Sequence, residues 1–272
     1  MKDFVLQQGV GGVWFGLFTH FLSIGVKHGI STRLGGISRA PYQSLNLGLH
    51  VGDDSVCVEK NRRLFCNAVG VNSEAVVAAE QIHGDKIAVI THEQAGKGAF
   101  SYKEAIAGTD ALVTNVPGVP LLLCYADCVP VCIVDPVQEA IGVIHAGWKG
   151  TVSKIVQKTL AVMGTQYGTK ADNCLVGIGP SIGPCCYQVN ETVLNPLKNT
   201  FPNWIDLVKN KQTGTFLNLW EANRCQLIDV GVHEERIVVS QVCTACNTSI
   251  FFSHRREAGA TGRMGALLQF GE

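Results

Sequence analysis

The sequence lacks an excess of charge of either sign. It contains 22 Lys and Arg residues against 22 Asp and Glu residues, so the formal net charge is zero, and charged residues make up only 16% of the chain. Nucleic-acid-binding proteins usually carry a basic patch, and helices that lie on membranes carry a basic amphipathic face. Neither feature occurs here. We therefore expect no nucleic acid and no membrane as a partner, and expect a protein that acts on small molecules.

The sequence also lacks linkers and repeats. No stretch of its 272 residues is rich in Ser, Pro or like charges, and no period recurs. Hydrophobic residues make up 46%, which is enough for a large core. These features predict one domain of α/β class over residues 1–272.

A secretory signal and a long hydrophobic run are missing too. The N-terminal segment MKDFVLQQGV has no apolar core with a cleavage site, and the uncharged run 11–26 contains His20 and is too short to span a bilayer comfortably. We expect a cytoplasmic protein.

Cysteine, in contrast, is abundant. Eleven cysteines in a chain of this size without a signal indicate reduced thiols, and an odd number cannot pair completely. Most are expected to be small buried residues, including Cys185 and Cys186. Cys243 and Cys246 have the CxxC spacing of zinc knuckles and redox pairs, but no second CxxC accompanies them. We expect a structural role for this pair, with a redox role as the alternative.

Hydrophobic periodicity and turn residues predict an alternation of strands and helices. A helix is expected after Asp53 or Asp54 and should end at Gly70, and another should begin with Thr151 as its N-cap. Strands are expected within 75–90, joined at Gly84 and Asp85, and within 108–136, 140–145, 174–183, 235–243 and 249–257. Helices are expected near 188–200 and within 218–232.

The segment LLLCYADCVPVCIVDP places Cys124, Cys128 and Cys132 four residues apart, as on one face of a helix. Pro130 argues against a helix, because a proline inside one costs about 3 kcal/mol. The flanking Val, Leu and Ile residues favour strands. Cys124 and Cys132 are then expected inside strands, whereas Cys128 lies in the break between them, where a side chain can face a cleft.

Three side chains at expected strand ends or turns form a candidate metal site. His83, Cys128 and His145 offer two imidazole nitrogens and one thiolate, and catalytic zinc usually has three protein ligands and one open position. Each histidine could instead be an ordinary surface or core residue. Cys128 has a second interpretation, as a nucleophile activated by His145.

Several polar residues near these positions are candidate substrate ligands. The side chains of Arg33, Lys149 and Arg255 could hold a phosphate or a carboxylate, and Asn46 could face a ligand or cap a turn. Asp127 could carry a proton or orient Cys128, or could cap a turn.

A series of motifs resembles a known family over nearly the whole chain. The motifs occur in this order: STRLGGIS, SLNLGLHVGDD, NRRL, EQIHG, GTDALVT, ADCVPV, IHAGWKG, GPSIGPCCYQV and FFSHRREAGATGRMGALL. They resemble the laccase-domain family, bacterial purine-nucleoside enzymes that are also called polyphenol oxidases or peptidoglycan editing factors.

The resemblance implies a layered α/β/β/α fold with mixed β-sheets, similar to a toxin cysteine-hydrolase domain. It implies a metal site at His83, Cys128 and His145 that holds zinc, with copper invoked under the oxidase name. The implied activities are deamination of adenosine and phosphorolysis of adenosine, inosine, guanosine and methylthioadenosine. Zinc-activated water would attack the purine C6, and Lys149 or Arg33 would hold orthophosphate.

Three alternatives follow from the same residues, and one of them is a metal-binding protein without catalytic activity. Cys128 could be the nucleophile of a hydrolase or amidase that acts on peptidoglycan precursors. A copper polyphenol oxidase is disfavoured, because a multicopper oxidase needs a type-1 site and a trinuclear centre, and one Cys with two His cannot form both.

Overall fold

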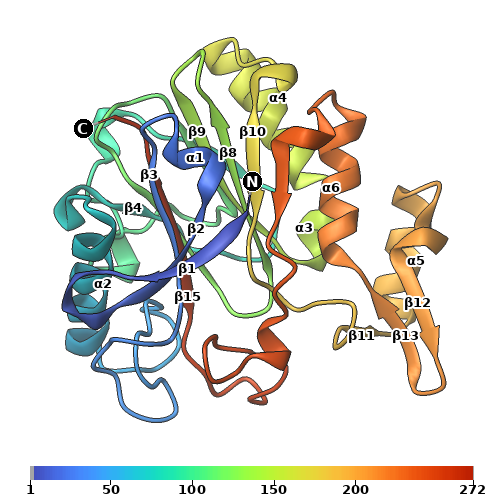
Figure 1. The fold of residues 1–272 in the computed structure, drawn as a ribbon, viewed down its shortest axis with the longest axis horizontal. Coiled ribbons are helices and arrows are strands. Elements are labelled where there is room, and N and C mark those ends of the chain that lie inside the picture. Colours follow the sequence, from blue (N-terminus) through green and yellow to red (C-terminus); the bar gives the residue numbers. More distant parts are fainter. Residues whose placement is uncertain (1–2, 272) are drawn as a thin grey trace.

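Two six-stranded sheets pack face to face in the computed structural model, which describes residues 3–271, and helices cover both outer faces (Figure 1). Both sheets combine antiparallel and parallel neighbours. The predicted α/β/β/α layering with mixed sheets is therefore confirmed. The single-domain prediction and the similarity to a toxin hydrolase stay predictions.

The first sheet contains the first and the last strand of the described residues, and α2 (Ser55–Val69) covers its outer face. Its strands in spatial order are β1 (Phe4–Gln8), β2 (Trp14–Phe18), β3 (Lys27–Ser31), β15 (Met264–Gln269), β7 (Leu121–Tyr125) and β4 (Val77–Ala78). The short α1 (Thr19–Leu22) joins β2 to β3. The side chain of Asp54 caps α2, and Gly70 ends it in the left-handed region at φ 82°, as the sequence predicts.

The second sheet contains the two longest strands among the described residues. Its strands in spatial order are β14 (Ile237–Val239), β10 (Leu175–Ile178), β8 (Val129–Asp135), β9 (Ala140–Ala146), β6 (Ala111–Thr114) and β5 (Ile87–Val89). Its outer face packs on α3 (Trp148–Val152), α4 (Ile155–Tyr167) and α6 (Leu219–Asp229). Every residue of β8 and β9 is buried, as expected for strands covered on both faces.

A small third sheet lies beside α5 (Glu191–Thr200) at one side of the molecule (Figure 1). It consists of β11 (Gln188–Val189), β13 (Gly214–Leu217) and β12 (Val208–Lys211). Within the described part of the chain, no helix is both long and apolar enough to cross a membrane.

The structure corrects three sequence predictions. The helix expected from Thr151 begins earlier, at Trp148 after Gly147, and breaks at Lys154, whose φ of 61° is left-handed. The strands expected at 75–90 do not pair, because β4 and β5 belong to different sheets. The segment 249–257 is a series of turns, because the Glu257 carboxylate accepts hydrogen bonds from the Ser253 amide and the Thr261 hydroxyl.

Candidate active site

Three donor side chains meet where the chain passes between the two large sheets. Cys128 lies between β7 of the first sheet and β8 of the second, and His83 lies in the passage from β4 to β5. His145 lies near the end of β9 and is paired with Pro130, two residues after Cys128. The three ligand atoms all lie within 4.8 Å of one another.

Asp110 organises this cluster. Its carboxylate oxygen lies 2.8 Å from Nδ1 of His145, which leaves Nε2 of that ring facing the other donors. The same carboxylate accepts the amide hydrogens of Ile82, His83 and Gly84, at 2.7 to 3.2 Å. One fully buried side chain therefore fixes both the His145 ring and the backbone that carries His83.

The backbone around the cluster lets the donor side chains lie close together. His83 has a left-handed φ of 61°, a conformation uncommon for residues other than glycine, and the Asp110 carboxylate holds it there. At Gly147, a β-carbon would lie 3.0 Å from Sγ of Cys128 and 3.4 Å from Cδ2 of His83. A side chain at this position would therefore crowd both donors.

In the metal-free protein, the surroundings of Cys128 and His145 shift the pKa of both side chains. Burial alone raises the pKa of the Cys128 thiol, but the imidazoles of His145 and His83 outweigh burial and lower the pKa to about 6. Burial alone lowers the pKa of His145, but Cys128 and Asp110 outweigh burial and raise the pKa to about 9. At neutral pH the metal-free site therefore holds a thiolate beside an imidazolium.

The cluster opens into a cavity of about 400 Å³, a volume in the range of small-molecule sites. Its walls combine aromatic, imidazole and cationic groups: His50, Gln81, Cys124, Trp148, Tyr187, His254, Arg255 and Arg263 contribute. A larger cavity of about 660 Å³ lies beside Glu93 and Lys97, but no Cys or His is among the described residues that line it. We therefore place the chemistry in the smaller cavity.

Asp127 connects the cluster to one wall of this cavity. One carboxylate oxygen accepts the hydroxyl hydrogen of Thr244 at 2.6 Å, and the other accepts the backbone amide of Arg255 at 2.6 Å. Both oxygens are thus used to hold a neighbouring loop next to Cys128. These contacts suit a positioning role better than that of a proton carrier.

The structure brings together some of the predicted site residues and not others. His83, Cys128, His145, Asp127 and Arg255 all line the cavity. Arg33, Asn46 and Lys149 are not among its lining residues. Their proposed contacts with substrate stay predictions that the geometry does not support.

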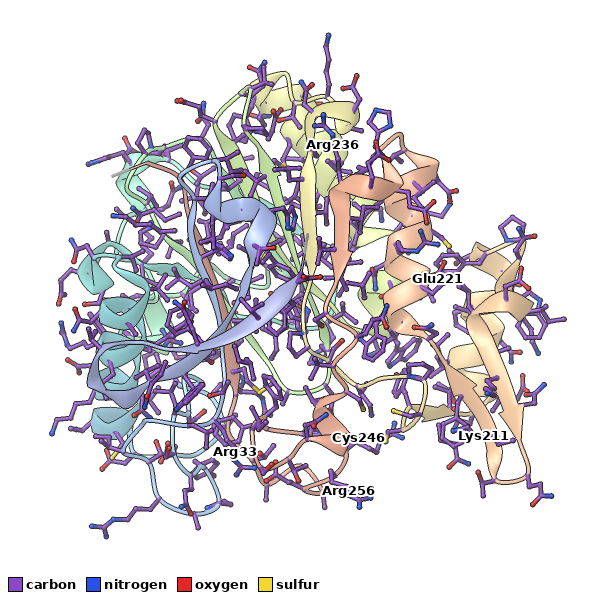
Figure 2. All side chains as sticks on the ribbon, in the orientation of Figure 1. Arg33, Lys211, Glu221, Arg236, Cys246 and Arg256 are labelled. Atoms are coloured by element: carbon purple, nitrogen blue, oxygen red, sulfur yellow. The ribbon has the colours of Figure 1, made fainter. Side chains whose placement is uncertain are left out.

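These three residues make contacts outside the cavity, and the turn-capping alternative for Asn46 fits the structure, where its side-chain oxygen accepts the amide hydrogen of Gly48 at 3.0 Å. Arg33 forms an ion pair with Glu257 at 2.9 Å and lies at the end of the molecule that also carries Cys246 and Arg256 (Figure 2). Asn46 is fully buried, and its side-chain oxygen accepts the amide hydrogen of Arg263 at 2.8 Å. Lys149 is exposed, with Nζ 5.8 Å from the centre of the Trp148 ring.

Sequence reasoning missed several residues of the site, among them Asp110, Trp148, Tyr187 and Arg263. Asp110 stands in GTDALVT, where a carboxylate directly before an apolar strand signals a buried acceptor. Trp148 follows His145 closely, and Tyr187 and Arg263 lie in other motifs of the resemblance. No local pattern marked these last two, because they reach the cavity only through tertiary packing.

The donor set suits zinc. Two imidazoles and a thiolate are common zinc ligands, and the cavity leaves a fourth position open to water or substrate. The Asp110 carboxylate on Nδ1 of His145 is the kind of partner that orients metal-bound histidines.

Comparison with known proteins identifies the family of the chain. Residues 27–271 match the family model described as multi-copper polyphenol oxidoreductase laccase. The chain belongs to this laccase family. The predicted family membership is thereby confirmed.

Relatives in the laccase family carry names from purine metabolism. The chain is 42% identical over 246 residues to purine nucleoside phosphorylase YlmD of Geobacillus stearothermophilus, covering 90% of each chain. It is 35% identical over 227 residues to adenosine deaminase RL5 of an unknown prokaryotic organism, covering 83% of this chain and 86% of the relative. The crystal structure of YlmD from Geobacillus stearothermophilus superimposes with a TM-score of 0.92 at 39% identity, covering 99% of this chain and 100% of that one.

Proposed function

We propose that this protein is a zinc-dependent enzyme of purine nucleosides that acts in the cytoplasm. It would deaminate adenosine to inosine and ammonia, and would transfer the ribosyl group of adenosine, inosine, guanosine or methylthioadenosine to orthophosphate, releasing the free base. The observation that carries this proposal is the His83, Cys128 and His145 donor set inside a cavity with aromatic and cationic walls. The names of the relatives support it, and eleven free thiols support a reducing compartment.

The cavity walls offer what a nucleoside and phosphate need. Trp148 and Tyr187 present aromatic faces on which a purine could stack. Arg255 and Arg263 line the same cavity and could hold the phosphate anion. Arg255 also lines a neighbouring hollow with Tyr187 and Asn190, so it lies where two parts of one substrate could meet.

Within the site, the protein's own groups would hold the reacting centre and its protons. When bound, zinc would supply a Lewis acid that makes water nucleophilic at neutral pH. Asp110 would keep the proton on Nδ1 of His145, so that Nε2 faces the cavity. Cys128 would remain a thiolate, and Asp127 would hold the Arg255 loop against it.

Two other activities fit these residues less well. A copper polyphenol oxidase needs several separate histidine-rich sites. Among the described residues, the groups that could hold a metal ion include only two histidines in total. A thiol hydrolase would use Cys128, His145 and Asp110 in the order nucleophile, base and orienting carboxylate, and metal dependence distinguishes it from the zinc enzyme.

The test combines metal analysis with product detection. Purified protein is incubated with adenosine, with and without orthophosphate, and inosine, adenine and ribose 1-phosphate are measured by chromatography. We expect inosine without phosphate, adenine and ribose 1-phosphate with it, and loss of all products after chelation with recovery on addition of zinc.

Three outcomes would contradict the proposal. Inosine formed by metal-free protein would rule out the zinc mechanism. Recovery with copper but not with zinc would overturn the choice of metal. Consumption of neither adenosine nor inosine by zinc-loaded protein would overturn the substrate class, and peptidoglycan fragments would then be assayed.

A further inference from the structure

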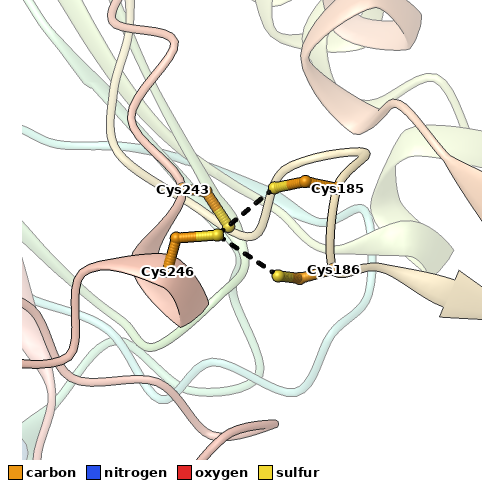
Figure 3. A group of neighbouring side chains, drawn as sticks. All are labelled: Cys185, Cys186, Cys243 and Cys246. Atoms are coloured by element: carbon orange, nitrogen blue, oxygen red, sulfur yellow. Dashed lines mark hydrogen bonds between the residues drawn. The ribbon is translucent and has the colours of Figure 1, made fainter.

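Four cysteines from two distant segments converge outside the active site (Figure 3). Cys185 and Cys186 lie in the loop between β10 and β11, and Cys243 and Cys246 border the 3-10 helix Thr244–Cys246. All four sulfur atoms lie within 4.8 Å of one another, and Sγ of Cys246 lies 3.5 Å from that of Cys185 and 3.4 Å from that of Cys186. The expectation that Cys185 packs inside is wrong, because it is exposed. We call these residues the four-thiol cluster.

The spacing of the sulfur atoms matches a tetrahedral metal site. A zinc ion with four sulfur ligands at about 2.3 Å keeps those sulfurs about 3.8 Å apart. Two of the observed separations, 3.5 and 3.4 Å, lie slightly below this value, and none of the others exceeds 4.8 Å. We propose that the four-thiol cluster binds a second zinc ion, which has a structural role.

The surroundings of the cluster suit negatively charged sulfur. The amide of Gly183 donates a hydrogen bond to Sγ of Cys243 at 3.2 Å. A side chain at Gly183 is excluded, because its β-carbon would lie 2.6 Å from the Trp220 ring. Nζ of Lys211 donates to the Cys185 carbonyl at 3.1 Å and brings a positive charge to the cluster. These contacts are of the kind that support thiolate ligands.

A disulfide accounts for this arrangement less well than a metal does. The sulfur–sulfur separations of 3.5 and 3.4 Å are well above the roughly 2.05 Å of a disulfide bond, and all four cysteines are free thiols. Four thiolates complete the tetrahedral coordination of zinc and leave no open position, which is typical of structural sites. Cys185 and Cys246 are exposed, so an ion can reach the cluster from solvent.

The cluster joins two loops that form walls of the active site. The loop with Cys185 and Cys186 continues to Tyr187, which lines the cavity. The loop with Cys243 and Cys246 contains Thr244, whose hydroxyl donates to Asp127 beside Cys128. An ion held by all four thiols would therefore fix these walls relative to each other.

Metal content tests the proposal with the full-length protein, purified with a reductant that does not chelate metals. The test variant is Cys185→Ser/Cys246→Ser, and the matched control is Cys57→Ser/Cys225→Ser, which changes two half-buried thiols elsewhere. We expect about two zinc ions per chain in the unchanged protein and in the control, and about one in the test variant and in Cys128→Ala.

These variants separate this proposal from the proposed function. A test variant that folds, as judged by circular dichroism, and keeps as much zinc as the control would overturn the second site. Loss of zinc from Cys128→Ala would bear on the active-site metal and not on the four-thiol cluster. A disulfide within the cluster, found by peptide mapping of protein purified without reductant, would also overturn the proposal.

Cobalt provides a readout that does not depend on the folding of the serine variant. In Cys128→Ala reconstituted with Co²⁺, the proposal predicts the strong sulfur-to-cobalt charge-transfer absorption of a tetrahedral thiolate site. Absence of this absorption with all four cluster thiols reduced would overturn the proposal. The bands of a tetrathiolate iron centre in protein as purified would overturn the assignment to zinc.

Discussion

The active-site donors and the four-thiol cluster use cysteine in opposite ways. At the active site, one thiol stands among two imidazoles and a buried carboxylate, and a cavity leaves one side open. In the four-thiol cluster all donors are sulfur, and they can surround an ion completely. An incomplete mixed set suits chemistry, whereas a complete set of thiolates suits structure. Residue type alone does not decide the role of a cysteine; the number and kind of its neighbours do.

The two sites also differ in how they control charge without metal. Two imidazoles lower the pKa of Cys128 to about 6. Burial, followed by the neighbouring thiols, raises the pKa of Cys186 to about 11. The pKa of Cys185 is also raised, mainly by burial, whereas hydrogen bonds from the Gly183 amide and neighbouring thiols outweigh burial and lower the pKa of Cys243. The active site is thus charged in advance, whereas Cys185 and Cys186 depend on an ion to release their protons.

Removal of Cys128 should have the largest effect on catalysis. We expect Cys128→Ala to lose its active-site metal and to reduce kcat/KM by about 10³-fold or more, equivalent to about 4 kcal/mol of transition-state stabilisation. Steady-state nucleoside assays measure the loss. The matched control is Cys132→Ala, because Cys132 is a thiol in the body of β8 and is 1% exposed. A reduction of less than tenfold in Cys128→Ala would show that the donor set is not the reacting centre.

In metal-free protein, Cys128 should be alkylated about 10²-fold faster than Cys186. At pH 7 the thiolate fraction of Cys128 exceeds that of Cys186 by about 10⁴-fold, and the weaker nucleophilicity of the more acidic thiol removes about 10² of this advantage. Both thiols are half-buried, so access is comparable. Iodoacetamide labelling followed by mass spectrometry measures the two rates.

The labelling rates of Cys128 and Cys186 should depend on pH in different ranges. The Cys128 rate should be constant above pH 7 and fall as the pH drops through about 6, because the thiolate takes up a proton there. The Cys186 rate should still rise with pH at pH 9. Equal rates at pH 7 would remove the proposed difference in charge between the sites.

A substitution of Asp110 tests whether its carboxylate orients the metal-binding side chains. We expect Asp110→Asn to reduce zinc affinity or kcat/KM by about 10-fold to 100-fold, because the amide cannot accept from three backbone amides and His145 together. Competition with a coloured chelator measures the affinity. The control is Asp135→Asn, in which another fully buried carboxylate that accepts backbone amides is changed. Equal zinc affinity in the two variants would assign Asp110 a structural role only.

Local patterns were sufficient to predict the strands around Cys128. Pro130 excluded a helix, and the structure places Cys124 and Cys132 in β7 and β8 with Cys128 between them. The helix that ends at Gly70 was predictable for the same reason, because its cap residues are adjacent to it in sequence. The metal triple came from strand ends together with the family resemblance, and its role as a ligand set stays a prediction.

Features that depend on distant contacts were not predictable. Cys185 and Cys246 are separated by 61 positions, and adjacent cysteines do not have the usual knuckle spacing, so the CxxC pair lacked a visible partner. Arg33 stands between a strand and a glycine-rich turn, as a ligand-binding residue could, yet Glu257, from the far end of the chain, binds it. Contacts of this kind are determined by tertiary packing, which hydrophobic periodicity and secondary-structure propensity do not predict.

Arg255 tests how closely the two sites are connected, and its expected effect is the smallest. It lies on the loop that follows the four-thiol cluster and lines the active-site cavity, and its amide is held by Asp127. If its guanidinium binds phosphate, Arg255→Ala should raise the KM for orthophosphate about tenfold or more, the loss expected for a hydrogen bond to a charged group. The KM for adenosine in deamination should change much less, because that reaction uses no phosphate.

The neighbouring Arg256 provides the control for this prediction. It is also exposed, it is not among the residues that line the cavity, and Figure 2 places it beside the loop that carries Cys246. Arg256→Ala should leave both KM values unchanged. If Arg255→Ala raised both KM values equally, the side chain would support the cavity wall as the four-thiol cluster does, and the phosphate would have to be held by Arg263 instead.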